Sequence, residues 1–218
     1  MKAYFVTAIG TEIGKTYVSG TLLRGWRQAG HAVHALKPVM SGFGEKELKV
    51  SDAGQLLAAC GTAVDPETVS RICLHRFEAP LAPNVAMRQA GVKQDYQAIL
   101  RFTRERLASA TTDYCLVEGA GGVMSPLTDS ALQIDFMADL GLPVILVAAP
   151  YLGAVSHTLT AIDALSARGL TLDRLIISQP DPASPAPSSL GEEVALFRQV
   201  RYSVVEHGAD DLSLQTPY

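Results

Sequence analysis

Short apolar runs rich in β-branched residues alternate along the chain with longer segments of helical hydrophobic periodicity. The apolar runs predict buried strands at residues 3–7, 32–37, 114–118, 144–149, 174–177 and 203–205. The periodic segments predict helices at residues 15–29, 52–60, 95–110, 133–140 and 154–168. This alternation predicts an α/β fold in which residues 1–218 form a single domain, a doubly wound parallel sheet with right-handed crossovers.

Turn residues fit these boundaries. Gly30 and Gly169 follow two of the predicted helices, where a left-handed cap is expected, and Ser51 can cap the helix that begins at Asp52. The proline-rich stretch 179–189 predicts a mobile loop inside the domain, because few residues follow it.

Composition narrows the class of protein. The 218 residues are 48% hydrophobic with a net charge of −4 and no lysine/arginine stripe, so no nucleic-acid partner is expected. Cys60, Cys73 and Cys115 lack metal-ligand spacing and predict reduced thiols in a cytoplasmic protein. The N-terminus does not resemble a signal peptide, and prolines interrupt the most apolar run, residues 142–155. No membrane association is therefore expected.

The first predicted strand is followed by Ala-Ile-Gly-Thr-Glu-Ile-Gly-Lys-Thr at residues 8–16 and then by an amphipathic helix. Such a loop turns backbone N–H groups around a phosphate at the positive end of the helix dipole. Lys15 would reach the β- and γ-phosphates, and Thr16 would place its hydroxyl on Mg²⁺. Ile9 stands where the strict pattern has glycine, so an ordinary capped strand-to-helix turn remains an alternative.

Charged residues also stand beyond the ends of the next strands. Lys37 could neutralise charge that develops during phosphoryl transfer, although strand-end lysines are often merely solvated. Glu118 ends an apolar strand before Gly-Ala-Gly-Gly, and Asp52 opens a helix; Mg²⁺ takes such carboxylate oxygens. Alternatively, Asp52 is a first-turn helix acid and Glu118 a structural carboxylate.

Taken together, these segments resemble the dethiobiotin synthetase family. The matching segments occur in the family order and at similar spacings, at residues 11–16, 37–42, 51–53, 117–122 and 142–147. The resemblance implies a P-loop NTPase-like fold and a homodimeric enzyme with Mg²⁺ as cofactor and ATP as co-substrate. Its reaction would be the carboxylation and ring closure of 7,8-diaminopelargonate with CO₂, through a carbamate and a carbamic–phosphoric anhydride.

The resemblance also implies roles for individual residues. Thr16, Asp52 and Glu118 would hold Mg²⁺, and Lys15 and Lys37 would bracket the carbamate and the γ-phosphate. The substrate contacts would be Lys37, Ser41, Gly121 and Ser156. The nucleotide contacts would be Glu12, Ile13, Gly14, Lys15, Thr16, Tyr17, Asp52, Glu118, Gly119, Ala120, Gly121, Ser178 and Gln179.

The chain departs from the family pattern in several places. Residues 8–10 are Ala-Ile-Gly where the family has Gly-Thr-Asp, and Ser156 followed by His157 replaces a substrate-binding asparagine. His157 is expected to be a packing or capping residue. Ser178 and Gln179 replace an asparagine that reads adenine, and the usual Pro-Val-Leu-Gly-x-Ile-Pro element is not evident around residues 203–205. The preferred nucleotide therefore stays open.

Other classes fit the residues less well. Partitioning and cell-division-positioning ATPases carry a signature lysine at the position of Gly10, which this chain lacks. Cobyric-acid-type amide ligases add a glutaminase domain that is not expected in 218 residues. A non-catalytic nucleotide-binding protein would not need the lysines and acids that this chain retains.

Overall fold

The computed structural model describes residues 1–218 except 45–46, 180, 182–184 and 213–218. Its centre is a six-stranded sheet, in the order β10-β9-β8-β1-β5-β2, in which every strand pairing is parallel. The strands span Lys2–Ala8 (β1), Val33–Leu36 (β2), Tyr114–Glu118 (β5), Val144–Ala148 (β8), Leu172–Ser178 (β9) and Tyr202–Val205 (β10). The predicted α/β fold and its six strands are confirmed.

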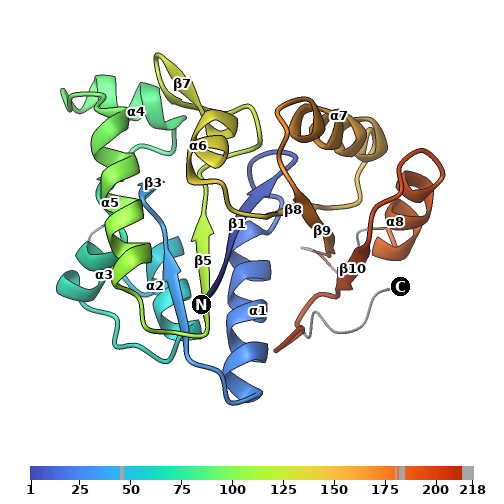
Figure 1. Ribbon diagram of the computed structural model, residues 1–218, viewed down its shortest axis with the longest axis horizontal. Coiled ribbons are helices and arrows are strands. Elements are labelled where there is room, and N and C mark those ends of the chain that lie inside the picture. The colour runs from blue at the N-terminus through green and yellow to red at the C-terminus, as the bar shows by residue number, and fades with distance from the viewer. Residues whose placement is uncertain (45–46, 180, 182–184, 213–218) are drawn as a thin grey trace.

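Helices cover both faces of this sheet (Figure 1). Alternate residues of β1 show the division, because Phe5 belongs to one hydrophobic cluster and Val6 to the other. The Val6 face packs against α1 (Lys15–Gln28) and α2 (Asp52–Ala59). The Phe5 face packs against α5 (Tyr96–Ser109), α6 (Gln133–Leu140), α7 (Ala154–Ala167) and α8 (Pro187–Ala195). Burial on both faces explains why the strands are predominantly apolar.

The predicted helix ends are also confirmed. Gly30 and Gly169 follow α1 and α7 with φ angles of 88° and 72°, a conformation that favours glycine. The Ser51 hydroxyl accepts a hydrogen bond of 3.1 Å from the backbone N–H of Gly54 and so caps α2.

Several short elements were not predicted, because two to seven residues carry too little periodicity. They are β3 (Val39–Ser41), α3 (Pro66–Ile72), β4 (His75–Phe77), α4 (Pro83–Gln89), β6 (Pro126–Thr128) and β7 (Ala131–Leu132). The prediction of a loop over 179–189 is wrong at residues 187–189, which form the first turn of α8. Pro187 occupies the first turn, where its missing N–H needs no partner. Residues 180 and 182–184 of that stretch lie outside the described part of the chain.

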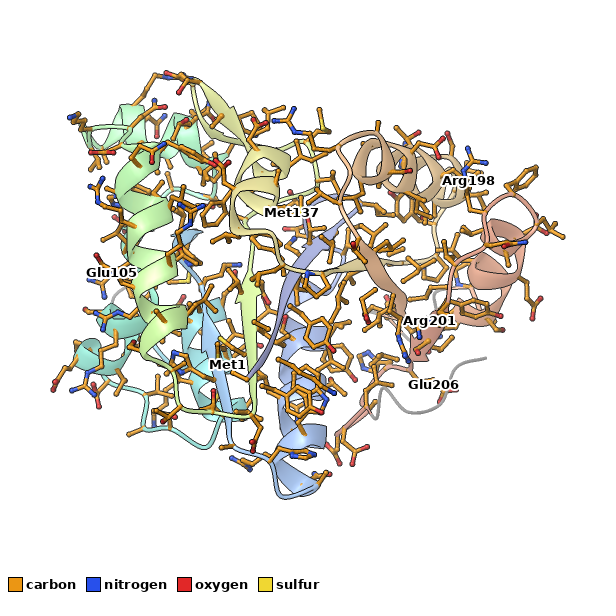
Figure 2. The ribbon with its side chains drawn as sticks, viewed as in Figure 1. Met1, Glu105, Met137, Arg198, Arg201 and Glu206 are labelled. Atoms are coloured by element: carbon orange, nitrogen blue, oxygen red, sulfur yellow. The ribbon has the colours of Figure 1, made fainter. Side chains whose placement is uncertain are left out.

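Beyond β10 the chain runs along α1. The Tyr17 hydroxyl lies 2.9 Å from the carbonyl oxygen of Glu206, which is labelled in Figure 2, and 3.1 Å from that of Ala209. Arg24 donates to the carbonyl oxygen of Asp210, and the N–H of Leu212 donates to that of Thr21. These bonds attach residues 206–212, called here the C-terminal segment, to α1.

No helix among the described residues has both the length and the apolar character needed to cross a membrane. The three cysteines are free thiols, buried at Cys73 and Cys115 and half-buried at Cys60.

Candidate active site

The carboxyl ends of β1, β2 and β5 meet at one edge of the sheet, and a cavity of about 600 Å³ opens there. Parallel sheets bind ligands at this edge. The cavity is lined by the loop between β1 and α1, by the ends of β2 and β3, by the start of α2 and by the turn after β5. Segments that are far apart in sequence thus contribute side chains to one space.

The phosphate loop, residues 8–16, has the backbone that its sequence predicts. Gly14 has a φ angle of 91°, and a Cβ atom there would lie 2.6 Å from the Oγ atom of Ser178, so only glycine fits. Glu12 has a φ angle of 59° and is the one non-glycine residue with positive φ among those described. This sparsely populated conformation is found at ligand-binding loops. Lys15 begins α1, and its Nζ donates to the carbonyl oxygen of Gly10 at 3.2 Å.

Lys37 lies between the two predicted carboxylates. Its Nζ atom is 2.7 Å from Oε1 of Glu118, 2.7 Å from Oδ2 of Asp52 and 3.2 Å from the carbonyl oxygen of Gly119. The residue is 2% exposed, so these three acceptors take the place of water around the ammonium group. The alternative of a solvated strand-end lysine is therefore wrong.

Glu118 is fully buried, and both of its oxygens accept hydrogen bonds. Oε1 accepts from the Thr16 hydroxyl at 2.8 Å as well as from Lys37, and Oε2 accepts from the Ser19 hydroxyl at 2.6 Å. Ser19 was not predicted as a site residue. One signal was available, because Ser19 follows Thr16 by three positions and therefore lies on the same side of α1.

The charges of the site depend on one another. Burial and, next, the neighbouring Lys37 lower the pKa of Lys15, while Glu118 and Asp52 oppose the change, and the resulting pKa is about 8. Burial alone would lower the pKa of Lys37, but the carboxylates of Glu118 and Asp52 hold it above its ordinary value. Burial likewise disfavours the charged form of Asp52, yet Lys37 holds that pKa below its ordinary value.

The oxygen donors of this cluster fit Mg²⁺. Thr16 supplies a hydroxyl, and Asp52 and Glu118 supply carboxylates. Both carboxylates contact the Nζ atom of Lys37, and the Thr16 hydroxyl donates to Glu118. Mg²⁺ prefers such hard oxygen ligands and takes few from protein, leaving positions for phosphate and water. The three residues predicted to hold the metal are thus brought together, and the cluster already accommodates a cation, the Lys37 ammonium.

Residues predicted to contact the organic substrate divide into two groups. Ser41 and Gly121 line the same cavity as Lys15 and Lys37. Ser156, on the first turn of α7, is exposed and lies outside the lining of that cavity. Its neighbour His157 bonds through Nδ1 to the Tyr151 hydroxyl at 2.8 Å and borders a separate groove. The substrate contacts of Lys37, Ser41, Gly121 and Ser156 all stay predictions.

The predicted nucleotide contacts divide in the same way. Among the described residues, the cavity lining includes Glu12, Gly14, Lys15, Thr16, Tyr17, Asp52, Ala120 and Gly121. Ile13 packs its side chain into the hydrophobic core. Ser178 is fully buried beneath Gly14, and Gln179 donates through its backbone N–H to Val205 at 2.9 Å. Ile13, Glu118, Gly119, Ser178 and Gln179 do not line the cavity. All of these nucleotide contacts stay predictions.

Comparison with known proteins shows the family of the chain. A protein-family model described as an AAA domain matches residues 2–207. The chain is 46% identical over 199 residues to the ATP-dependent dethiobiotin synthetase BioD of Phenylobacterium zucineum (strain HLK1), covering 91% of this chain and 84% of that protein. It is 40% identical over 212 residues to the protein of the same name from Methylobacterium nodulans (strain LMG 21967 / CNCM I-2342 / ORS 2060), covering 95% and 94%.

Solved structures share the fold at low sequence identity. The MinC:MinD cell division protein complex of Aquifex aeolicus contains a chain that matches with a TM-score of 0.56 and 12% identity, over 94% of this chain and 81% of that one. The signal recognition particle receptor FtsY of Elizabethkingia anophelis, in complex with GDP, matches with a TM-score of 0.53 and 15% identity, over 99% of this chain and 60% of that one. These likenesses establish the P-loop NTPase-like fold alone, whereas the sequence relatives establish more. The chain belongs to the dethiobiotin synthetase family of ATP-dependent ligases.

Proposed function

We propose that this protein converts 7,8-diaminopelargonate, CO₂ and ATP to dethiobiotin, ADP and phosphate. The observation that carries the proposal is a cluster of five side chains at the sheet edge. One cavity is lined by Lys15, Thr16, Lys37 and Asp52. The buried Glu118 bonds to Thr16 and Lys37 behind that lining. Family membership supports the same reaction, because the relatives are named ATP-dependent dethiobiotin synthetases.

The proposed reaction has three covalent steps. One amine of the substrate attacks CO₂ and loses a proton, which leaves a carbamate. A carbamate oxygen then attacks the γ-phosphorus of ATP, the bond to the leaving ADP breaks, and a carbamic–phosphoric anhydride forms. Finally the second amine attacks the carbonyl carbon and loses a proton, phosphate leaves, and the cyclic urea closes.

The second step brings two anions together, and the lysines oppose that repulsion. Lys15 and Lys37 both line the cavity, and each is nearly buried, so their charges act in an environment with little water. We assign Lys37 to the carbamate and the γ-phosphate, and Lys15 to the β- and γ-phosphates. To contact substrate, Lys37 must give up part of its bonding to Glu118 and Asp52.

Thr16, Asp52 and Glu118 would hold Mg²⁺, since their oxygens suit that ion and stand together. When bound, Mg²⁺ neutralises charge on the phosphate oxygens during transfer. The carboxylates of Asp52 and Glu118 would then have the metal as a second cationic partner beside Lys37.

Contacts with the organic substrate and the nucleotide base complete the proposal. Ser41 and the backbone at Gly121 would orient the diamine, because both border the cavity that Lys37 faces. Ser156 does not line that cavity, and we propose that it contacts a part of the substrate that extends beyond it. Gln179, whose backbone is bonded to Val205 at the end of β10, would lie on the nucleotide side with Ser178.

We further propose a homodimer located in the cytoplasm. A groove of about 490 Å³ is bordered by Val123, Met124 and His157, and Met124 is 54% exposed. Tyr151, bonded to His157, and Leu152 are also exposed beside it. A second copy of the chain would cover this apolar face. The free thiols suit the reducing cytoplasm.

The direct test is to incubate the protein with diaminopelargonate, bicarbonate, Mg²⁺ and, in separate reactions, each nucleoside triphosphate, and to detect dethiobiotin by mass spectrometry. We expect product with ATP. Product with another nucleotide would identify a different base preference. Absence of product with every nucleotide, in protein that is folded and binds nucleotide, would favour a non-catalytic nucleotide-binding protein.

A further inference from the structure

Ser19 lies in α1, and no solvent reaches it. Its hydroxyl donates a hydrogen bond of 2.6 Å to Oε2 of Glu118, across 99 positions of sequence. The contact therefore joins the helix after the phosphate loop to the carboxyl end of β5.

The two oxygens of Glu118 have different surroundings. Oε1 meets the Thr16 hydroxyl and the Nζ of Lys37, both of which line the cavity. Among the described residues, Ser19 is the one donor to Oε2, and Ser19 does not line the cavity. Oε1 thus contacts groups that line the cavity, whereas Oε2 is bonded to a residue outside the cavity lining.

Loss of the Ser19 hydroxyl would leave Oε2 without a donor in a place that water does not reach. A buried charged oxygen without a hydrogen bond is strongly disfavoured, so the carboxylate would rotate or shift toward its remaining partners. Such movement would change the position of Oε1 relative to Thr16 and Asp52. Outer-sphere partners of metal-binding carboxylates commonly act in this way.

We propose that Ser19 is a positioning residue, which fixes the Glu118 carboxylate so that Oε1 faces Thr16 and Lys37 and would be placed to hold Mg²⁺. The inference rests on the proposed function in one respect, the assignment of Glu118 as a metal ligand. Ser19 itself does not contact substrate.

The primary test is Mn²⁺ binding to the Ser19→Ala variant, measured by electron paramagnetic resonance with and without a non-hydrolysable ATP analogue. We expect the dissociation constant for Mn²⁺ to rise about 10–100-fold, the range typical for loss of such a partner. Alanine is favourable in a helix, so α1 should persist. Unchanged Mn²⁺ affinity in folded Ser19→Ala would overturn the proposal.

Kinetics provide a second readout. We expect kcat of Ser19→Ala to fall at fixed Mg²⁺ and to recover partly at high Mg²⁺, with little change in KM for diaminopelargonate. A rise in that KM with kcat unchanged would contradict a positioning role at the metal. If the wild-type protein makes no dethiobiotin, the proposed function fails, while the Mn²⁺ measurement still decides the role of Ser19.

A matched control separates positioning from general loosening of the fold. Thr103 in α5 is also fully buried, and its hydroxyl bonds only within its own helix, to the carbonyl oxygen of Ile99. Thr103→Val should leave Mn²⁺ affinity unchanged, and equal losses in both variants would overturn the proposal. Ser19→Cys, which keeps a weak donor, should bind Mn²⁺ with intermediate affinity. If Ser19→Ala does not fold, wild-type affinity in Ser19→Cys overturns the proposal.

Discussion

The Nζ atom of Lys37 donates a hydrogen bond of 2.7 Å to Oε1 of Glu118, and both residues are almost completely removed from solvent. A second carboxylate, that of Asp52, lies equally close to the same ammonium group. One lysine therefore serves as counter-ion to both acids proposed to hold Mg²⁺. Its removal would affect the charge balance of the whole site.

We expect Lys37→Ala to retain nucleotide binding but to lose phosphate release that depends on diaminopelargonate and bicarbonate. In the proposed function, nucleotide binding relies mainly on the phosphate loop, whereas Lys37 would act on the charge that develops in the reaction. Because Glu118 would lose a buried partner, we also expect a loss of about 3–5 kcal/mol in stability without ligands.

Two measurements check this prediction, a phosphate-release assay and urea denaturation. The exposed Lys49→Ala serves as the control and should behave as wild type in both. Substrate-dependent turnover at the wild-type rate in Lys37→Ala would remove Lys37 from the mechanism.

Lys15 should couple nucleotide binding to proton uptake. With a pKa of about 8, its amine is roughly half-protonated at pH 8 in the free protein. A bound triphosphate favours the charged form and raises the pKa, so binding takes up protons at pH 8. Nucleotide affinity should accordingly fall as the pH rises above about 8.

Calorimetry in buffers of different ionisation enthalpy measures this uptake. Lys15→Arg, which stays charged at every pH used, should bind without the proton uptake that is due to Lys15. Equal uptake in wild type and Lys15→Arg would assign the proton to another group.

Gly14→Ala should destabilise the protein for two separable reasons. A non-glycine residue at a φ of 91° is strained by about 1–2 kcal/mol, and the added Cβ would clash with the Ser178 hydroxyl. In the double variant with Ser178→Gly, the clash is removed but the strain remains. Denaturant unfolding should compare wild type, Gly14→Ala, Ser178→Gly and the double variant. The double variant should lose less stability than the sum of the two single losses. Strictly additive losses would mean that Ser178 does not restrict the loop.

Tyr17→Phe should loosen the C-terminal segment. The Tyr17 hydroxyl lies within hydrogen-bond distance of the carbonyl oxygens of both Glu206 and Ala209, and loss of such a bond costs about 0.5–1.5 kcal/mol. Amide hydrogen exchange at residues 206–212 should become faster. Tyr151→Phe, which alters a hydroxyl bonded to His157, should leave that exchange unchanged. If the two variants exchange alike, Tyr17 does not hold the segment.

Much of the site could be predicted because its residues follow strand ends. Glu118 ends an apolar run, and a parallel sheet brings such ends to one edge, so its meeting with the phosphate loop follows from topology. Lys37 was harder to predict, since a strand-end lysine is usually solvated. Its burial depends on two acids that are 15 and 81 positions away.

Other features depend on contacts that a local pattern does not carry. Ser19 looks like any small residue on an amphipathic helix, and its partner is remote in sequence. The C-terminal segment contacts α1 through side-chain hydrogen bonds between residues that are 186 to 192 positions apart in sequence. Pro187 suggested a loop, yet proline is equally suited to begin a helix, as it does in α8.

The proposed reaction depends on attack of a carbamate oxygen on the γ-phosphate, and an isotope measurement tests this step most directly. Diaminopelargonate, ATP and Mg²⁺ are mixed with ¹⁸O-labelled bicarbonate, and the reaction is stopped before the label exchanges with water. Mass spectrometry of both products should show one ¹⁸O atom in the released phosphate for each dethiobiotin formed. Dethiobiotin accompanied by unlabelled phosphate would contradict the carbamate route, and labelled bicarbonate that yields no dethiobiotin would contradict the reaction itself.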